Sequence, residues 1–377
     1  MDKKPDNFVF PTQRNISRVL SGAMEAVGLA SFCPDDKEIL NFPNAKAAVV
    51  VLVDGLGSNL IDRYSGYTRF IRRLDEHKPL TSVVPSTTAA AITSLGTGLM
   101  PGEHAVVSYS LKTPHSYKNF SLIQWDDPRV DPRSWQKHDT LAERLGRTAN
   151  DTVVIQPPSY VNSGLSLCAL RSMPSACATY PHERVEETLK QIKNGKKLIY
   201  LYWGDVDKAG HAYGVGSLQW LNVLEECDSS IEQLRSLLPH DVLLILTADH
   251  GMINVGNRWD VAQESLLSCD VDLISGEERA VHIYTSQPRH VIERWKEFFQ
   301  EKVWMLTRED AFSSGLFGHK YSDFSMRVSG DVIAFFTDDT CVVDNRTRIV
   351  HGKNYMVGVH GSLTSDEMLI PLYTYMG

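Results

Sequence analysis

Three runs of apolar residues constrain the fold of this chain more than any other feature of its sequence. They are Ala47–Val53, Lys197–Trp203 and Val242–Ala248, and Val153–Gln156 is a shorter candidate of the same kind. A run that is apolar throughout, instead of at alternate positions, is typical of a strand in a parallel sheet covered on both faces. Helical patterns lie between these runs, at Thr88–Leu95, Asp139–Gly146, His182–Asn194 and Ser217–Leu238. The alternation predicts an α/β fold, with a doubly wound, mostly parallel sheet and helices on both of its faces.

The segment 255–355 has a different pattern from the rest of the chain. It contains three candidate strands and one helix, at Ala280–Thr285, Val303–Leu306, Val332–Phe336 and His290–Gln300, respectively. We therefore expect a core formed by residues 1–254 and 356–377, with an α+β cap at 255–355 inserted into it.

Charge and cysteine content exclude several classes of protein. The net charge of −8 argues against a nucleic-acid scaffold, which usually has a basic face. The N-terminal stretch has no apolar signal-peptide core, and no apolar run has the length of a membrane span, so we expect no membrane association and a cytoplasmic location. The absence of a CxxC pattern excludes a disulfide framework and a thiolate zinc site. We expect mostly reduced core residues at the six cysteines, Cys33, Cys168, Cys177, Cys227, Cys269 and Cys341.

Acidic residues and histidines follow the three apolar runs. Asp54 follows the first run, a loop with Asp207 and His211 follows the second, and Asp249 and His250 follow the third. Because the carboxyl ends of parallel strands form one ligand crevice, we expect these side chains to converge. A single Asp in this position often caps the next helix, but three such motifs are hard to explain by capping.

Carboxylate oxygen and imidazole nitrogen together suit Zn²⁺, Mn²⁺ or iron. Asp207 and His211 are four residues apart, and we expect Gly210 to allow a tight turn before the histidine. A lone His360 between glycine-rich neighbours would be structural, but with the other candidates we take it as a metal ligand. Asp205 is interpreted as a structural residue that supports the ligands.

The segment Pro85–Ala91 is predicted to be a loop that opens a helix. A helix N-terminus presents free N–H groups and the positive end of a dipole, which together suit a phosphate group. The hydroxyls of Ser86 and Thr87 can alternatively be simple helix caps. A hydroxyl in this segment would become a nucleophile if a metal ion lowered its pKa.

The motifs resemble those of the alkaline phosphatase superfamily, and specifically its type I phosphodiesterase / nucleotide pyrophosphatase family. The similar segments are PSTTAAAITSLGTGLMPGEHA, the DxxxH and DHG motifs, and the closing HGSLTSDEMLIPL. The resemblance implies an alkaline phosphatase-like core and two divalent ions, with Zn²⁺ expected and Mn²⁺ as the alternative. It implies Thr88 as the nucleophile and two ligand sets, which are Asp54, Asp249, His250 and Thr88 for one ion and Asp207, His211 and His360 for the other.

The sequence departs from the family pattern near the expected nucleophile. Alanines follow Thr88 where the family commonly has Pro and Asn. Tyr109 occupies the position of an Asn that helps to hold a phosphoryl oxygen, so we take Tyr109 as a substrate-binding candidate. Tyr160 is a second candidate, which could stack on a nucleobase or could equally be a buried structural residue.

We therefore expect a two-metal hydrolase of small phosphate esters that cleaves phosphodiester or pyrophosphate bonds, of nucleotides or related molecules, through a covalent phospho-threonine intermediate. The alternatives are a phosphomonoesterase or phosphonate hydrolase of the same superfamily and, from another class, an inactive metal-binding interaction module. The natural substrate, the metal and the oligomeric state are not encoded in any pattern of the sequence.

Overall fold

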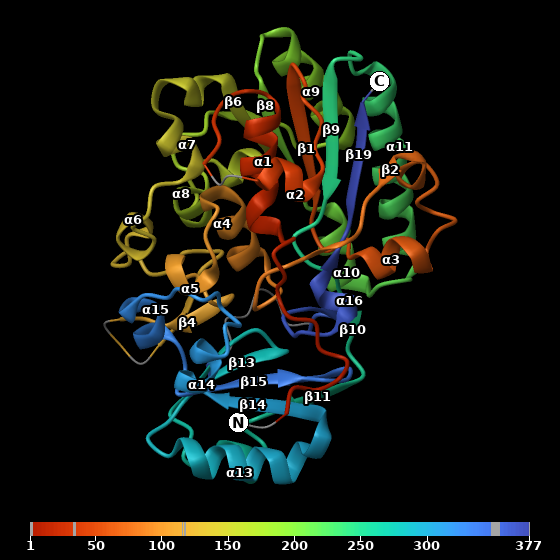
Figure 1. The fold of residues 1–377 in the computed structure, drawn as a ribbon. Coiled ribbons are helices and arrows are strands. Elements are labelled where there is room, and N and C mark those ends of the chain that lie inside the picture. The colour runs from red at the N-terminus through yellow and green to blue at the C-terminus, as the bar shows by residue number, and fades with distance from the viewer. Residues whose placement is uncertain (1–2, 33–34, 115, 117, 348–354, 377) are drawn as a thin grey trace.

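The computed structural model describes residues 3–32, 35–114, 116, 118–347 and 355–376. A seven-stranded sheet forms the centre of the larger part of the molecule (Figure 1). Its order is β2 (Asp75–Glu76), β19 (Leu372–Met376), β9 (Val242–Thr247), β1 (Ala47–Val53), β8 (Leu198–Trp203), β6 (Thr152–Gln156) and β7 (Ser175–Cys177).

The pairing of the central strands confirms the predicted fold class. The five strands from β9 to β7 are parallel, and only β19 runs in the opposite direction, pairing antiparallel with both β9 and β2. All seven residues of β1 are buried, and successive side chains of a strand point to opposite faces. Both faces of the sheet are therefore covered, which is why the strand is apolar at every position.

Twelve α-helices belong to the part of the core that the structure describes. They are α1 (Val19–Ala26), α2 (Asp36–Leu40), α3 (Ser58–Arg63), α4 (Thr88–Thr97), α5 (Pro101–His104), α6 (Pro132–Trp135), α7 (Leu141–Leu145), α8 (Gly164–Ala169), α9 (Pro181–Lys193), α10 (Asp205–Tyr213), α11 (Leu218–Leu237) and α16 (Ser365–Met368). Short strand pairs join β3 (Leu80–Thr81) with β18 (Leu369–Ile370), β4 (Ser110–Lys112) with β5 (Asn119–Ser121), and β10 (Ile253–Asn254) with β17 (Gly358–Val359).

One local prediction is wrong: the segment after β8 is the helix α10 and not a loop with a tight turn. Helical spacing brings Asp207 and His211 to one face, since residues four apart are neighbours on a helix. Gly210 leaves room for the Met252 side chain, because a Cβ atom there would lie 2.3 Å from the Met252 sulfur. The motif thus correctly predicted that Asp207 and His211 are close, but a helix and not a turn brings them together.

A second, antiparallel sheet lies below the core in Figure 1. Its order is β12 (Leu273–Gly276), β13 (Ala280–Tyr284), β15 (Val332–Phe336) and β14 (Val303–Thr307). It is accompanied by β11 (Asn257–Asp260) paired with β16 (Thr340–Val343), and by α12 (Ser265–Ser268), α13 (Pro288–Phe299), α14 (Arg308–Ser313) and α15 (Asp323–Val328). These elements fall within the predicted cap, although the division of the chain into two domains stays a prediction.

The cap sheet and the core share a hydrophobic cluster. Ala89 of α4 and Phe120 of β5 belong to the same cluster as Phe312 and Phe335 of the cap. Because the interior of a protein is closely packed, the cap is held against the start of α4. No helix that the structure describes combines the length and apolarity of a membrane span. Cys33 lies outside the described residues, and the other five cysteines are free.

Candidate active site

Three buried aspartates meet at the carboxyl ends of β1, β8 and β9. Asp54 follows β1, Asp249 follows β9, and Asp207 lies in the first turn of α10. The Oδ1 atom of Asp249 accepts hydrogen bonds from the backbone N–H groups of Gly55 at 3.2 Å and His250 at 3.0 Å. Asp249 Oδ2 and Asp207 Oδ1 are buried and have no hydrogen-bond partner among the described residues. Two buried carboxylate oxygens are thus left free in the same small region.

Three histidines surround these carboxylates with the same orientation. In His211, His250 and His360 the Nδ1 atom lies 2.8 to 3.0 Å from a backbone carbonyl oxygen. The carbonyl groups belong to Gly358, Gly251 and Ser86, respectively. A carbonyl oxygen only accepts, so each Nδ1 carries a hydrogen, and in the neutral ring each Nε2 then offers a lone pair. This is the arrangement of a metal-binding histidine whose second nitrogen is held by the protein.

The Nε2 atoms point to the carboxylates. His250 Nε2 lies 3.4 Å from Asp54 Oδ1 and 3.5 Å from Asp249 Oδ2. The Nε2 atom of His211 lies 3.3 Å from Asp207 Oδ2, and the Nε2 atom of His360 lies 3.9 Å from Asp207 Oδ1. The rings of His250 and His360 are stacked, with centroids 3.7 Å apart.

Two groups of these side chains have donor atoms within 4.8 Å of one another. One group contains Asp54, Asp249 and His250, and the other contains Asp207, His360 and again His250. The structure therefore brings together all the predicted protein ligands. The assignment of His211 to the second ion, where the second group has His250, stays a prediction.

The electrostatics of the cluster favour a cation. Burial, and then the neighbouring Asp249 and Asp207, raise the pKa of Asp54 well above its usual value. Burial, and then Asp207, raise the pKa of Asp249 to about 7. Burial, and then His250, lower the pKa of His360 well below the usual histidine value. Within the described residues, no lysine or arginine forms an ion pair with the three aspartates. A divalent cation would compensate their charge, and oxygen and nitrogen donors of this kind fit such ions.

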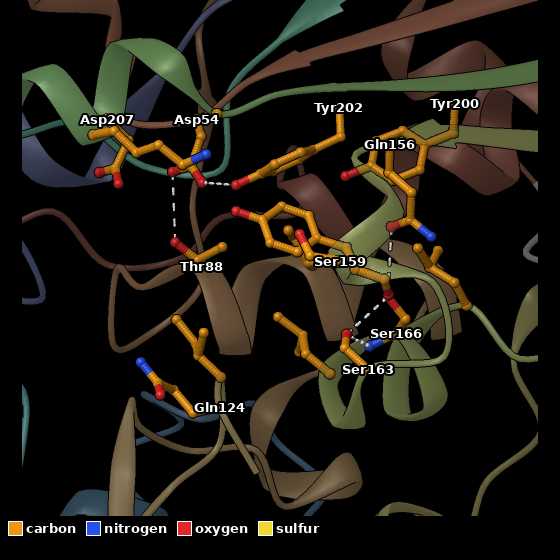
Figure 2. Close-up of a pocket in the computed structure, with 17 residues that line it drawn as sticks. Asp54, Thr88, Gln124, Gln156, Ser159, Ser163, Ser166, Tyr200, Tyr202 and Asp207 are labelled. Atoms are coloured by element: carbon orange, nitrogen blue, oxygen red, sulfur yellow. Dashed lines mark hydrogen bonds between the residues drawn. The ribbon is translucent and has the colours of Figure 1, made fainter. Parts of the chain in front are cut away.

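Thr88 is the first residue of α4 and faces this cluster. Its Oγ1 atom lies 3.1 Å from His250 Nε2 and 3.5 Å from Asp54 Oδ1, as Figure 2 shows for the aspartate. The alternative that Ser86 and Thr87 are helix caps is wrong. The Ser86 hydroxyl donates to the carbonyl oxygen of Ser362 at 2.7 Å, and the Thr87 hydroxyl donates to Glu277.

Sequence reasoning missed two residues at this site. Tyr202, on β8, donates its hydroxyl to Asp54 Oδ2 (Figure 2). A tyrosine in a fully apolar run was the available signal, because a buried hydroxyl usually needs a partner. Glu277 comes from the cap, and burial raises its pKa to about 8 while the Thr87 hydroxyl opposes that rise. No motif near Glu277 indicated that it would reach the core.

Asp205 has a structural partner. Its carboxylate accepts a hydrogen bond from the buried Arg184 guanidinium. The guanidinium also lies 4.6 Å from the Trp203 ring and donates to the backbone carbonyl of Thr179. This pairing agrees with the supporting role expected for Asp205.

Two cavities open on either side of Thr88. The first is about 410 Å³ and is lined by aliphatic side chains and by hydroxyl and amide groups, including those of Gln124, Gln156, Ser159, Ser163 and Ser166 (Figure 2). The second is about 620 Å³ and lies between core and cap. Thr88, Asp207 and Lys208 line both cavities, so the cluster of aspartates and histidines lies where the cavities meet.

The two predicted substrate-binding tyrosines lie in different cavities. Tyr160 lines the first cavity, where its ring packs edge-on against Tyr202 with centroids 5.8 Å apart. The Lys208 ammonium lies 5.7 Å from the centre of the Tyr160 ring. Tyr109 lines the second cavity. Both tyrosines are half-buried, and their contact with substrate stays a prediction.

The model of the family described as "Type I phosphodiesterase / nucleotide pyrophosphatase" matches residues 48–363. The chain belongs to this family. The match includes Asp54, Thr88 and His360, and it spans the cap as well as most of the core.

Curated relatives of this family member are longer proteins. An uncharacterized pyrophosphatase/phosphodiesterase of Schizosaccharomyces pombe is 26% identical over 218 residues, which cover 54% of this chain and 44% of the relative. Human ectonucleotide pyrophosphatase/phosphodiesterase family member 1 is 23% identical over 244 residues, which cover 60% of this chain and 26% of the relative. The chain thus matches less than half the length of these relatives.

Solved structures of two kinds share the fold of this family member. Murine ectonucleotide pyrophosphatase / phosphodiesterase 5 aligns with a TM-score of 0.67 and 17% identity, covering 86% of this chain and 87% of that chain. Phosphonoacetate hydrolase from Sinorhizobium meliloti, in complex with phosphonoformate, aligns with a TM-score of 0.65 and 15% identity, covering 87% and 89%. Both likenesses are evidence for an alkaline phosphatase-type fold.

Proposed function

We propose that this family member is a two-metal hydrolase of small phosphodiesters or pyrophosphates and that Thr88 is its nucleophile. The observation that carries the proposal is the position of the Thr88 hydroxyl at the N-terminus of α4. It lies 3.1 Å from His250 Nε2, beside free carboxylate oxygens. Family membership and the relatives' names support the same reaction class.

The proposed metal ligands are the seven predicted residues, in the two sets that the family resemblance implies. Carboxylate and imidazole donors favour Zn²⁺, and Mn²⁺ is compatible with the same set. When bound, two divalent ions would supply positive charge that neutralises the phosphoryl group and lowers the pKa of a coordinated hydroxyl.

The residues of the chain would carry out two displacements. The Thr88 oxygen loses its proton and forms a bond to phosphorus while the bond to the leaving oxygen breaks. The departing alcohol or phosphate takes up one proton, which balances the proton lost by Thr88. Water then attacks the phosphorus of the phospho-threonine and breaks its bond to Thr88, which restores the hydroxyl. Two in-line displacements give net retention at phosphorus. The N–H groups of the first turn of α4 face the phosphoryl oxygens throughout.

The two cavities favour a substrate with a group on each side of phosphorus. The first cavity, rich in hydroxyl and amide groups, suits a polar group such as a nucleoside, with Tyr160 at its wall. The second cavity would accept the other group, beside Tyr109. A monoester would leave one of the two cavities without a function.

The test compares four compounds with and without a chelator. These are bis-p-nitrophenyl phosphate, p-nitrophenyl thymidine 5′-phosphate, p-nitrophenyl phosphate and phosphonoacetate. Chelator-sensitive cleavage of the two diesters well above the other compounds is the expected result. Preferred cleavage of the monoester or of phosphonoacetate would favour the corresponding alternative. Two bound metals without turnover of any compound would favour an inactive interaction module.

A further inference from the structure

A short turn of the cap reaches into the core beside the nucleophile. The turn consists of Glu277, Glu278 and Arg279 and connects β12 to β13. Each of its three charged side chains has a partner on another segment. Glu278 pairs with Arg258 at 2.9 Å, whereas Arg279 pairs with a carboxylate of α16. Glu277 contacts the loop that precedes α4, where it accepts a hydrogen bond from the Thr87 hydroxyl.

Thr87 occupies the N-cap position of α4 without acting as a cap. Its backbone is extended, with φ −137° and ψ 145°, which is the usual conformation for an N-cap. A threonine there normally accepts a hydrogen bond from an N–H group of the first helical turn. The Thr87 side chain forms no such bond with any described residue and donates to Glu277. The first-turn N–H groups are therefore left without a side-chain cap at the end that carries Thr88.

The other side of the same loop is fixed by the core. The Ser86 carbonyl accepts the His360 Nδ1–H at 2.8 Å, and the Ser86 hydroxyl donates to the Ser362 carbonyl at 2.7 Å. Gly361 lies between His360 and Ser362 in the sequence and has φ +126°. A Cβ atom on Gly361 would lie 2.8 Å from the Glu277 Cβ. The absence of a side chain at Gly361 is what lets the Glu277 side chain approach the loop.

We propose that Glu277 is a positioning residue that holds the Thr87 hydroxyl away from the helix end, so that the first-turn N–H groups of α4 stay free to bind the phosphoryl group. This proposal rests on the proposed function of Thr88. A purely structural link between cap and core is the competing explanation for Glu277. The pair of Arg279 with Glu367 already links cap and core, and its hydrogen bonds do not involve Thr87 or Thr88 among the described residues.

The experiment uses the full metal-loaded chain with Glu277→Ala, Glu277→Gln, Thr87→Val and the double variant Glu277→Ala/Thr87→Val. Turnover of the best diester gives kcat and KM, and calorimetry gives the dissociation constant of inorganic phosphate. Metal content and melting temperature are measured for every variant.

In Glu277→Ala the released hydroxyl caps the helix and competes with the phosphoryl group. We expect kcat to fall roughly 10²-fold, and phosphate binding to weaken about tenfold, with both metals retained. Glu277→Gln keeps an acceptor oxygen and should retain most of the kcat. In the double variant valine cannot cap, so kcat and phosphate binding should recover toward the values of Thr87→Val.

Three results would overturn the proposal. They are a Glu277→Ala variant with normal kcat and phosphate affinity, a double variant no better than Glu277→Ala, or loss of metal in Glu277→Ala. If the wild-type chain binds metal but hydrolyses no ester, the proposed function fails. Phosphate affinity across the same variants then still decides the role of Glu277.

Discussion

The guanidinium of Arg279 and the carboxylate of Glu367 form two parallel hydrogen bonds, each 2.8 Å long, and neither side chain has contact with solvent. Arg279 comes from the cap and Glu367 from α16 near the end of the chain. Arg279 also donates to two backbone carbonyls of the cap, and Glu367 accepts from the Ser362 N–H at 2.9 Å. This pair therefore connects the cap to the segment that carries His360.

Replacing Arg279 by alanine should strongly destabilise the protein, because it leaves a buried, unpaired carboxylate. We expect a loss of about 3–5 kcal/mol in the free energy of unfolding, measured by urea denaturation. Arg69→Ala is the matched control, since its pair with Glu225 is exposed and should change stability little. Equal effects of the two substitutions would contradict this account of the pair.

Thr88→Ala should abolish turnover and leave the metal content intact. The variant removes the proposed attacking oxygen while the six proposed carboxylate and imidazole ligands remain, so kcat should fall by more than roughly 10³-fold. Thr97→Ala is the control at the other end of the same helix, where the Thr97 hydroxyl donates to the Thr93 carbonyl at 2.7 Å and accepts from the Leu99 N–H at 3.2 Å. Metal analysis and ester hydrolysis measure the two properties. Loss of metal from Thr88→Ala would show that Thr88 is chiefly a structural ligand.

Tyr202→Phe should weaken metal binding, because the Tyr202 hydroxyl holds Asp54. Groups that orient a ligand in this way typically contribute about 10- to 100-fold in metal affinity. Competition with a chromogenic chelator measures the change. Tyr200→Phe is the control, since the buried Tyr200 hydroxyl has no partner in the described part of the chain. The prediction fails if both variants bind metal equally well.

His104 should make the protein less stable in acid. Burial lowers its pKa to about 3, and its ring accepts from the Val106 N–H at 3.1 Å and contacts the Ser94 hydroxyl at 2.9 Å. The unfolded chain binds a proton at this group below a pKa of about 6.5, whereas the folded chain does not. The stability that the neutral His104 contributes to the folded state is therefore complete above pH 6.5 and is lost as the pH falls toward 3. The free energy of unfolding should fall with a limiting slope of about 1.4 kcal/mol per pH unit.

Urea unfolding between pH 7 and pH 4 measures this slope. The protein is first treated with a chelator, so that competition between protons and metal ions does not add to the pH dependence. His104→Gln should reduce the slope, although it also lowers stability at neutral pH. His319 lies on the surface, and His319→Gln should leave the slope unchanged. An unchanged slope in His104→Gln would assign the acid sensitivity to other groups.

The bounds of the buried strands in both sheets were predicted closely, because the signal for such a strand lies within its own residues. Ala47–Val53 and Val332–Phe336 have the predicted bounds, and β9 ends one residue earlier than expected. A strand covered on both faces needs apolar residues throughout, so its pattern is local and visible. The convergence of Asp54 and Asp249 followed from the parallel arrangement alone.

The features that were missed depend on contacts between distant segments. Gly210 suggested a turn, but its role is fixed by Met252, which lies 42 positions later in the sequence. Glu277 reaches Thr87 across a separation of 190 residues. Tyr202 could be predicted as buried, but its hydrogen bond to Asp54 depends on the register of two strands. Contacts of this kind leave no periodic pattern in the sequence.

The orientation of the three histidines by backbone carbonyls has a consequence for how this site can vary. A carbonyl group is present at every position whatever the side chain, so a substitution at Ser86 or Gly358 does not delete the acceptor itself. Point mutation can remove one of these imidazoles but cannot easily rotate it. The path of the main chain thus fixes the orientation of the imidazole rings. The orientation should be kept in sequences that have diverged extensively, as long as that path is kept.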